Sequence, residues 1–210
     1  MDVHNQREFE TMTKEEMVQS YLTHLECTYC QKTYKPDVPI RTCFNCGKVI
    51  YARYDLDSAG KTLTREALGQ RPPNMWRYFE VMPVRDQANV VTLGEGFTPT
   101  FKAESLGNKI GSNNLLIKDE GLNPTASFKA RGLSAAISKA KELGFSKVTL
   151  PSAGNAGGAL ATYAARAGMK AHVFMPRDAP EANRKEVVST GAQLTLVDGL
   201  ISDAGRMSRE

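Results

Sequence analysis

The stretch Asn123-Pro-Thr-Ala-Ser-Phe-Lys129-Ala-Arg-Gly132 follows a short apolar segment at residues 115–117 and leads into apolar residues at helical spacing. This pattern places Lys129 in the first turn of a helix. There the positive end of the peptide dipoles disfavours an ammonium, and packing against Phe128 adds desolvation that acts in the same direction. Both effects favour the neutral amine, the form of lysine that makes a Schiff base with an aldehyde. Lys129 is therefore the first catalytic candidate in the chain.

Apolar strands and helices alternate from residue 115 onward. The expected strands cover residues 115–117, 147–150, 171–175 and 193–197, and the expected helices cover residues 127–143, 155–167 and 180–190, with a last helix from about residue 201. Gly144, Gly168 and Gly191 each follow a helix, as left-handed C-caps do. Four strand–helix units with short links predict an α/β fold, with a parallel sheet and helices on both faces.

The alternation stops within a helix that has hardly begun. We therefore expect the chain to be truncated and its α/β domain to be incomplete. The alternative is that the last helix is merely short and that the small sheet is complete.

A glycine-rich turn, Pro151-Ser-Ala-Gly-Asn-Ala-Gly-Gly158, lies between an expected strand and an expected helix. Its glycines let the backbone approach a ligand, and N–H groups at a helix start can hold a carboxylate or phosphate. The turn matches neither the dinucleotide G-x-G-x-x-G pattern nor the P-loop ending. A tight connection without a ligand is the alternative. If Lys129 and this turn follow two strands of one parallel sheet, both lie at its carboxyl edge, where ligands bind.

The four cysteines of the chain form two pairs, Cys27-x-x-Cys30 and Cys43-x-x-Cys46, with twelve residues between the pairs. Each pair can offer two sulfurs to a tetrahedral zinc ion, and the spacer can run out and back as a hairpin. Since all four positions are filled by protein, the zinc is expected to be structural. Four reduced cysteines without metal, or a knuckle that docks a protein or nucleic acid, remain alternatives.

Composition limits the classes of protein. The 210-residue chain is 41% hydrophobic and 24% charged, as in soluble globular proteins, and its net charge of +4 is spread over segments of mixed sign. No nucleic-acid partner is implied by this charge. The sequence has no apolar run long enough for a membrane span and no secretory signal, which predicts a cytoplasmic protein with reduced cysteines.

Further patterns divide the rest of the chain. A capping-box pattern at residues 13–16 and apolar residues at helical spacing up to Leu25 predict a helix. Turn-forming residues at 55–60 predict a loop, Trp76 is expected to be a packing anchor, and residues 93–99 predict a tight turn. The expected divisions are a helical extension at 1–26, a zinc ribbon at 27–54, a connecting segment at 55–92 and the α/β domain at 93–210.

The lysine stretch and the Ser152-Ala-Gly-Asn155-Ala-Gly turn together resemble the fold-type II pyridoxal-phosphate enzymes, which have the tryptophan synthase beta-like fold. Within them the chain is most similar to the threonine synthase family. The segment Leu-Gly-Glu-Gly-Phe-Thr-Pro at 93–99, the sequence Trp76-Arg-Tyr78 and the four-cysteine ribbon are also similar to segments of that family. The resemblance covers residues 25 to 210.

The resemblance implies a role for each matching residue. Lys129 would bind pyridoxal 5′-phosphate and then move protons on the substrate, with Phe128 beside it among the cofactor-binding residues. Asn155 would donate a hydrogen bond to the ring hydroxyl of the cofactor. The α-carboxylate of a small amino-acid substrate would be held by Ser152, Ala153, Gly154 and Asn155. The implied reaction converts O-phospho-L-homoserine and water to L-threonine and phosphate.

Two departures from the family pattern concern the substrate: Ala126 stands where glycine is usual and Ala130 where aspartate is frequent. The phosphate cup and the partner of the pyridine nitrogen belong to a later half of the family pattern, so we expect this chain alone to be inactive. A serine or threonine ammonia-lyase, or a related β-replacement enzyme, is the first alternative. A non-catalytic zinc-ribbon binding protein is the second. A homodimer of the full-length protein is left open.

Overall fold

The structure is a computed structural model that describes residues 18–210, so the capping-box pattern at residues 13–16 lies outside the described residues. The described chain forms two compact units. The first contains the residues up to Arg71 together with Tyr78–Asp86, and the second contains Pro72–Arg77 together with Gln87–Glu210. Within residues 18–210, no helix has the length and apolar character needed to cross a membrane. The division of the chain into four segments stays a prediction.

The first unit contains a three-stranded antiparallel sheet of order β2-β1-β3, made of β1 (Leu22–Cys27), β2 (Thr33–Tyr34) and β3 (Ile50–Tyr54). The helix expected up to Leu25 is therefore wrong for residues 22–25, which lie in β1. The apolar residues that suggested helical spacing, Met17, Tyr21, Leu22 and Leu25, span only about two turns. The β1 backbone instead finds partners on both sides, with Leu25 opposite Tyr34 and Ala52.

Two short helices follow the sheet, α1 (Leu56–Thr62) and α2 (Arg65–Gln70). The loop expected at residues 55–60 is wrong, because Asp55 is the N-cap of α1 and its side chain accepts a hydrogen bond from the Ser58 N–H. The same polar residues favour turns and helix caps, so composition alone does not separate the two. The chain then passes between the units through η3 (Met75–Val81).

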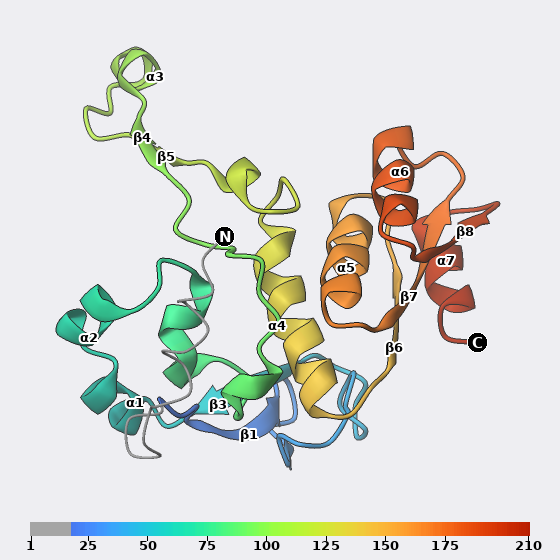
Figure 1. The fold of residues 1–210 in the computed structure, drawn as a ribbon, viewed down its shortest axis with the longest axis horizontal. Helices are drawn as coiled ribbons and strands as arrows, with labels where there is room; N and C mark the ends of the chain where they lie inside the picture. The colour runs from blue at the N-terminus through green and yellow to red at the C-terminus, as the bar shows by residue number, and fades with distance from the viewer. Residues whose placement is uncertain (1–17) are drawn as a thin grey trace, which may run out of the picture. The chain divides into compact units, whose positions relative to one another are not determined.

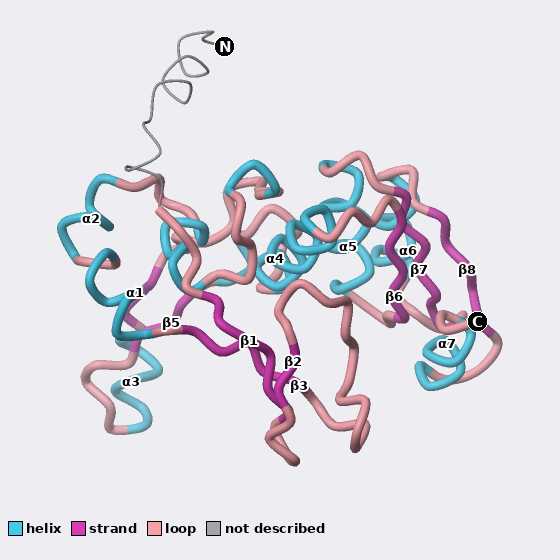
Figure 2. Tube along the Cα trace, turned by 90° about the horizontal axis from the view of Figure 1, so that it is seen from below, coloured by secondary structure: helices cyan, strands magenta, loops and turns pink. Residues whose placement is uncertain are grey.

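The second unit contains the parallel sheet, of order β6-β7-β8, made of β6 (Lys147–Pro151), β7 (Lys170–Pro176) and β8 (Gln193–Val197). Figure 2 shows these strands side by side. The helices after them are α5 (Asn155–Arg166), α6 (Glu181–Ser189) and α7 (Ile201–Met207). Figure 1 shows α5 and α7 on opposite sides of the sheet, and both contact β6 and β7. The α/β fold with helices on both faces is confirmed.

Helix α4 (Lys129–Glu142) precedes the sheet and packs against α5. Gly144, Gly168 and Gly191 follow their helices with φ angles of 79°, 70° and 81°, which confirms them as left-handed residues. The core between the sheet and its helices contains these large buried side chains: Ile137, Leu160, Tyr163, Val173, Met175 and Val187.

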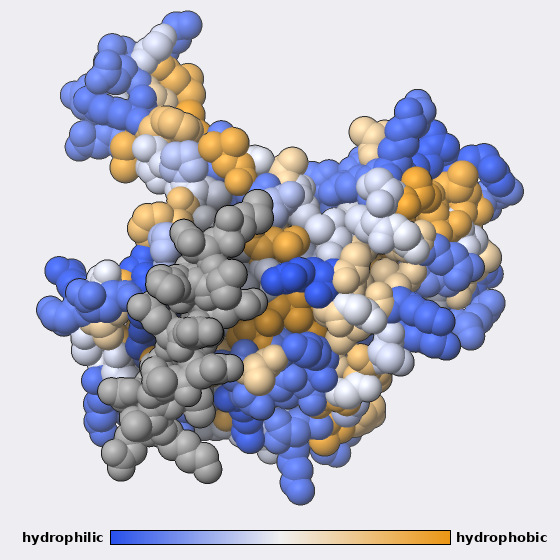
Figure 3. All heavy atoms as spheres, in the orientation of Figure 1, coloured by the Kyte–Doolittle hydropathy of each residue, from blue (hydrophilic) through white to orange (hydrophobic). Residues whose placement is uncertain are grey.

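The first expected strand is not part of the parallel sheet. β5 (Leu116–Lys118) pairs antiparallel with β4 (Thr100–Lys102), and α3 (Glu104–Ile110) lies between them in sequence. A run of three apolar residues carries no information on its pairing partner, which only the tertiary structure decides. Leu116 is 63% exposed, and Figure 3 shows apolar atoms gathered on this segment. Two short 3-10 helices, η4 (Gln87–Asn89) and η5 (Glu120–Leu122), complete the unit.

Candidate functional site

The two cysteine pairs form two turns of the same construction. The Gln31 N–H donates to the Cys27 carbonyl over 3.2 Å, and the Gly47 N–H donates to the Cys43 carbonyl over 2.8 Å. The residue after each pair is left-handed, with φ of 60° at Gln31 and 70° at Gly47. Each turn therefore brings two sulfurs to one side, as a zinc knuckle does.

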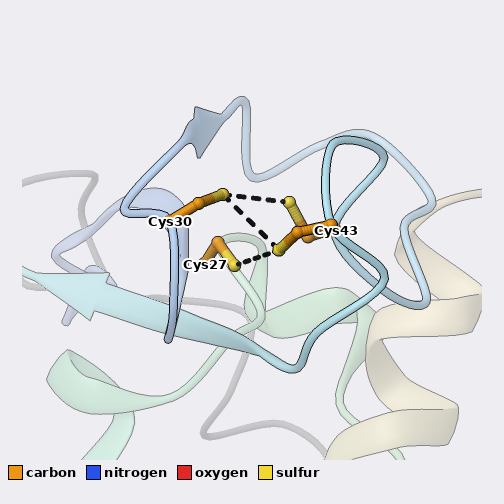
Figure 4. Close-up of side chains that lie close together, drawn as sticks. Cys27, Cys30 and Cys43 are labelled. Atoms are coloured by element: carbon orange, nitrogen blue, oxygen red, sulfur yellow. Dashed lines mark hydrogen bonds between the residues drawn. The ribbon is translucent and has the colours of Figure 1, made fainter.

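The four sulfur atoms lie within 4.8 Å of one another, and Figure 4 shows the labelled side chains pointing toward a common centre. Cys27 Sγ is 3.4 Å from Cys46 Sγ, and Cys30 Sγ is 3.5 Å from Cys43 Sγ. These distances are too long for a disulfide and close to the edge of about 3.8 Å in a zinc tetrahedron with 2.3 Å bonds. The donor set thus fits a tetrahedral ion that prefers sulfur.

Tyr34 is a second-layer residue of this cluster that the sequence did not reveal. Its Oη lies 3.1 Å from Cys43 Sγ and accepts a hydrogen bond from the Phe44 N–H. Burial raises the pKa of the Cys43 thiol, but hydrogen bonds from Tyr34 and from nearby backbone N–H groups outweigh it and lower the pKa to about 6. A cysteine that ionises readily is a better metal ligand.

Lys129 is the first residue of α4, as predicted from the sequence. Its Nζ lies 4.2 Å from the centre of the Phe128 ring, which is 57% exposed. The expected desolvation by Phe128 is therefore weak, and the ring face attracts an ammonium instead. Within residues 18–210, Lys129 Nζ forms no hydrogen bond or ion pair, so the Phe128 ring is its one side-chain contact of this kind.

The loop before Lys129 has two unusual features. Ala126 has a φ of 50°, a left-handed conformation that costs a residue with a Cβ about 1 kcal/mol. Thr125 is buried, and its hydroxyl has no hydrogen-bond partner within the described residues. A buried hydroxyl without a partner is uncommon and marks a place where a ligand can supply one.

Glu120 ties this loop to α4. Its carboxylate accepts hydrogen bonds from Arg131 Nε over 2.7 Å, Arg131 Nη2 over 2.8 Å, Thr98 Oγ1 over 2.7 Å and Asn123 Nδ2 over 3.0 Å. The hydrogen bonds from Arg131 and Thr98 lower the pKa of the Glu120 carboxyl to about 2. Because Arg131 lies two residues after Lys129, this ion pair holds the first turn of α4 in place.

Glu95 is a second buried anchor, and it was not singled out within the turn predicted at residues 93–99. Its fully buried carboxylate accepts from Ser134 Oγ over 2.5 Å, Tyr163 Oη over 2.6 Å and Trp76 Nε1 over 3.0 Å. Burial raises the pKa of Glu95, but the hydrogen bonds from Ser134 and Tyr163 outweigh it, so the pKa lies below its ordinary value. Ser134 is on α4 and Tyr163 on α5, so Glu95 joins the two helices.

Some N–H groups of the glycine-rich turn are hydrogen-bonded within the turn, and others are not. Ser152 Oγ accepts from the Gly154 and Gly157 N–H groups, and the Ser152 N–H donates to Phe174 in the sheet. Ser152 and Gly154 thus build the turn. The N–H groups of Ala153, Asn155 and Ala156 form no hydrogen bond within the described chain. Three unbonded donors at a helix start can receive an anion, and binding of a carboxylate there stays a prediction.

The structure brings the lysine and the turn to neighbouring helix ends. Figure 1 shows α4 and α5 side by side, with their first turns at the same end, and the two helices are in contact. The expected arrangement on one edge of the parallel sheet is wrong for Lys129, because β5 pairs with β4 outside that sheet. Helix packing, rather than strand order, places Lys129 and Asn155 at the same end of the unit.

Asn155 is exposed at this end, where its Oδ1 accepts a hydrogen bond from Asn183 Nδ2 over 2.9 Å. Asn183 lies on α6 and was not a candidate in the sequence. Nothing in a helix pattern distinguishes a polar residue that faces another helix from one that faces water.

Comparison with known proteins gives one family. The profile described as "Pyridoxal-phosphate dependent enzyme" matches residues 91–210. The chain is 36% identical over 185 residues to a threonine synthase of Methanocaldococcus jannaschii, which covers 88% of this chain and 45% of that relative. It is 45% identical over 130 residues to a threonine synthase of Synechocystis, covering 60% of this chain and 34% of that relative. The chain thus spans less than half the length of these relatives.

Solved structures agree on the fold. A pyridoxal 5′-phosphate-dependent aspartate racemase is similar with a TM-score of 0.51 and 32% identity, over 53% of this chain and 36% of the racemase. A diaminopropionate ammonia lyase of Escherichia coli has a TM-score of 0.53 over 58% of this chain and 37% of the lyase. Its identity of 20% supports the fold alone.

Proposed function

The chain belongs to the pyridoxal-phosphate-dependent enzyme family, and from this premise we propose that it carries the lysine-bearing part of a threonine synthase-type active site. The observation that carries the proposal is the pairing of two helix ends. Lys129 begins α4, the unbonded N–H groups of the glycine-rich turn begin α5, and the two helices pack with these ends together.

The residues at these helix ends fit the cofactor. A lysine amine without a hydrogen bond or ion pair can react with an aldehyde, and the N–H donors of the turn can bind an anionic group. The unpartnered hydroxyl of Thr125, buried in the loop next to Lys129, adds a further polar group for a ligand. When bound, pyridoxal phosphate supplies the electron sink that stabilises negative charge on the substrate carbon.

Each side chain then has a defined task. Lys129 Nζ would hold the cofactor through its aldehyde group and would then serve as the base that moves a proton on the substrate. Asn155 would donate a hydrogen bond to the ring oxygen of the cofactor and so help to orient it. The N–H groups of Ala153 and Asn155 receive the substrate carboxylate, while Ser152 and Gly154 hold the turn that aims them. Phe128 lies against the lysine side chain.

The proposed overall reaction converts O-phospho-L-homoserine and water to L-threonine and phosphate. Its support is the similarity to the threonine synthases of M. jannaschii and Synechocystis. The substrate is a small amino acid, which matches a turn that offers two or three N–H groups rather than an extended groove.

Titration of the chain with pyridoxal phosphate tests cofactor attachment. We expect an absorbance change that is absent in Lys129→Ala and present in Lys109→Ala, an exposed lysine on α3. Borohydride reduction followed by peptide mapping should find the cofactor on Lys129. Attachment to another lysine, or no attachment at all, contradicts the proposal.

Product analysis separates the proposed reaction from its alternative. Because this chain alone is expected to be inactive, the assay uses a protein of the full length of the threonine synthase relatives. Phosphate release from O-phospho-L-homoserine supports the synthase, whereas 2-oxo acid release from serine or threonine supports an ammonia-lyase. Cofactor attachment without either product limits the proposal to the binding of the cofactor.

We also propose that Cys27, Cys30, Cys43 and Cys46 hold a structural zinc ion. Four sulfur ligands leave no position for water or substrate, so the ion stabilises the ribbon and takes no part in the reaction. A zinc content near one per chain supports this role, and a content near zero contradicts it.

A further inference from the structure

Two polar side chains of α6 contact the end of α5 that carries the glycine-rich turn. Asn183 donates to Asn155 Oδ1 over 2.9 Å, and the interaction with Asn183 lowers the pKa of the Glu186 carboxyl. Residues three apart lie on the same face of a helix, so Asn183 and Glu186 both face α5. Asn183 thus links α6 to Asn155, and Glu186 lies one turn further along the same face of α6.

The position of Glu186 is set by a close approach of the two helices. A Cβ atom on Gly158 would clash with the Glu186 carboxyl group, which packs directly on this buried glycine. Burial raises the pKa of the Glu186 carboxyl, and the hydrogen bond from Asn183 acts in the opposite direction. Gly158 is one helical turn after Asn155, so the carboxyl lies next to the turn that carries the candidate site.

The hydrogen-bonding capacities of these groups leave one consistent arrangement. The Asn183 NH2 group points toward Asn155, and a nearby carboxylate, which only accepts hydrogen bonds, favours the same orientation of the amide. One hydrogen of this NH2 group goes to Asn155 Oδ1. Asn155 accepts this hydrogen bond with its side-chain carbonyl oxygen. The NH2 group of Asn155 forms no hydrogen bond within residues 18–210.

We propose that Glu186 and Asn183 are positioning residues that orient the Asn155 carboxamide so that its NH2 group, rather than its oxygen, faces the ligand. The inference rests on the proposed function, in which Asn155 donates to the ring oxygen of pyridoxal phosphate. A carboxamide turned the other way presents an acceptor to that oxygen and repels it. The orientation therefore decides whether Asn155 strengthens or weakens cofactor binding.

The sharpest test is Asn183→Asp, which keeps the size of the side chain and replaces its donor by an acceptor. Asn155 must then turn its NH2 group toward α6. In the ¹H–¹⁵N spectrum of the cofactor-free chain, we expect the Asn155 side-chain signals to shift and to exchange more slowly with water. These signals are identified by their loss in Asn155→Asp. Lys185→Gln, an exposed position on the same helix, should leave them unchanged.

Cofactor affinity provides the second readout. Asn183→Asp should raise the dissociation constant of pyridoxal phosphate about tenfold, toward that of Asn155→Ala, which corresponds to about 1.4 kcal/mol. Glu186→Gln should have a smaller effect, because glutamine can donate as well as accept and no longer imposes one orientation on Asn183. Gly158→Ala displaces the Glu186 carboxyl and should resemble Glu186→Gln.

Unchanged Asn155 side-chain signals in a folded Asn183→Asp variant overturn the inference. If circular dichroism shows that this variant is unfolded, Asn183→Leu replaces it, since loss of the donor must also move the signals, and unchanged signals again overturn the inference. The spectrum needs no cofactor. Absence of Lys129-dependent absorbance therefore rejects the proposed function, while the orientation of Asn155 is still measured.

Discussion

The four-cysteine cluster and the Lys129–Asn155 site are assembled in opposite ways. The cluster is built from two turns within residues 27–48, each closed by its own backbone hydrogen bonds. The second site draws on separate segments of the chain, joined by the carboxylates of Glu95 and Glu120. Local spacing is thus enough to bring four sulfurs together, whereas the lysine and the turn depend on long-range polar contacts.

Loss of the metal is the largest effect that the comparison predicts. Cys27→Ser should abolish stoichiometric zinc binding, since the binding free energy of a structural zinc site is on the order of 10 kcal/mol. Atomic absorption on the purified protein measures the zinc content. Tyr29→Ser, an exposed position within the same turn, should keep the metal. Equal zinc in both variants would contradict the assignment of Cys27.

Removal of the buried anchor comes next. Glu95→Ala leaves the Tyr163 hydroxyl buried without its acceptor and leaves Ser134 with the Val91 carbonyl as its acceptor, and we expect a loss of about 3–5 kcal/mol in the free energy of unfolding. Urea unfolding gives this value. Glu104→Ala, an exposed acid on α3, should change stability by less than about 0.5 kcal/mol. If Glu95→Ala and Glu104→Ala unfold at similar urea concentrations, Glu95 does not stabilise the packing of α4 on α5.

Acid should weaken the Glu120 anchor. The folded-state pKa of about 2 lies below the ordinary value of 4.5, so the ion pair with Arg131 contributes its full stability above about pH 4.5. That contribution is lost as the pH falls from 4.5 toward 2, and amounts to about 1–2 kcal/mol for a partly exposed pair. Glu120→Gln should have a lower free energy of unfolding at pH 7, and this free energy should change less between pH 4.5 and pH 2 than in the unmodified protein. If the unmodified protein and Glu120→Gln lose stability equally as the pH falls, the ion pair between Glu120 and Arg131 does not stabilise the fold.

The smallest effects concern left-handed residues, which occur in both regions. Ala126→Gly and Gln31→Gly should each stabilise the protein by up to about 1 kcal/mol, because glycine adopts positive φ without strain. Gly47→Ala should destabilise it by a similar amount. Thermal unfolding of the three variants measures the shifts. A lower melting temperature for Ala126→Gly would mean that the φ of this residue is not strained.

Prediction from the sequence worked where the signal is periodic or closely spaced. The strands β6, β7 and β8 and the helices α4, α5 and α6 lie within a few residues of their expected positions, because apolar periodicity and glycine C-caps mark both types of element. It failed for residues 22–25 and 55–60. In each case a short segment fits more than one backbone conformation, and its partners in space decide between them.

The candidate site also contains some residues that the sequence predicts and others that it does not. Lys129, Asn155 and the four cysteines stand in sequence patterns with a chemical reason, and the structure places them where such chemistry is feasible. Glu95, Glu120 and Asn183 stand in no pattern of their own. Their importance arises from partners that lie 11 to 68 residues away, and a polar side chain in a loop or on a helix does not reveal those partners.

By itself the sequence determined the sulfur cluster, the positions of the strands β6, β7 and β8 and the lysine at the start of α4, because backbone propensity and side-chain spacing act over a few residues. Only the tertiary structure decided that β5 leaves the parallel sheet, that α4 packs beside α5 and that the Asn155 carboxamide meets Asn183. The physical reason is desolvation. A buried polar group must find a partner, and the position of that partner is set by the packing of the whole unit.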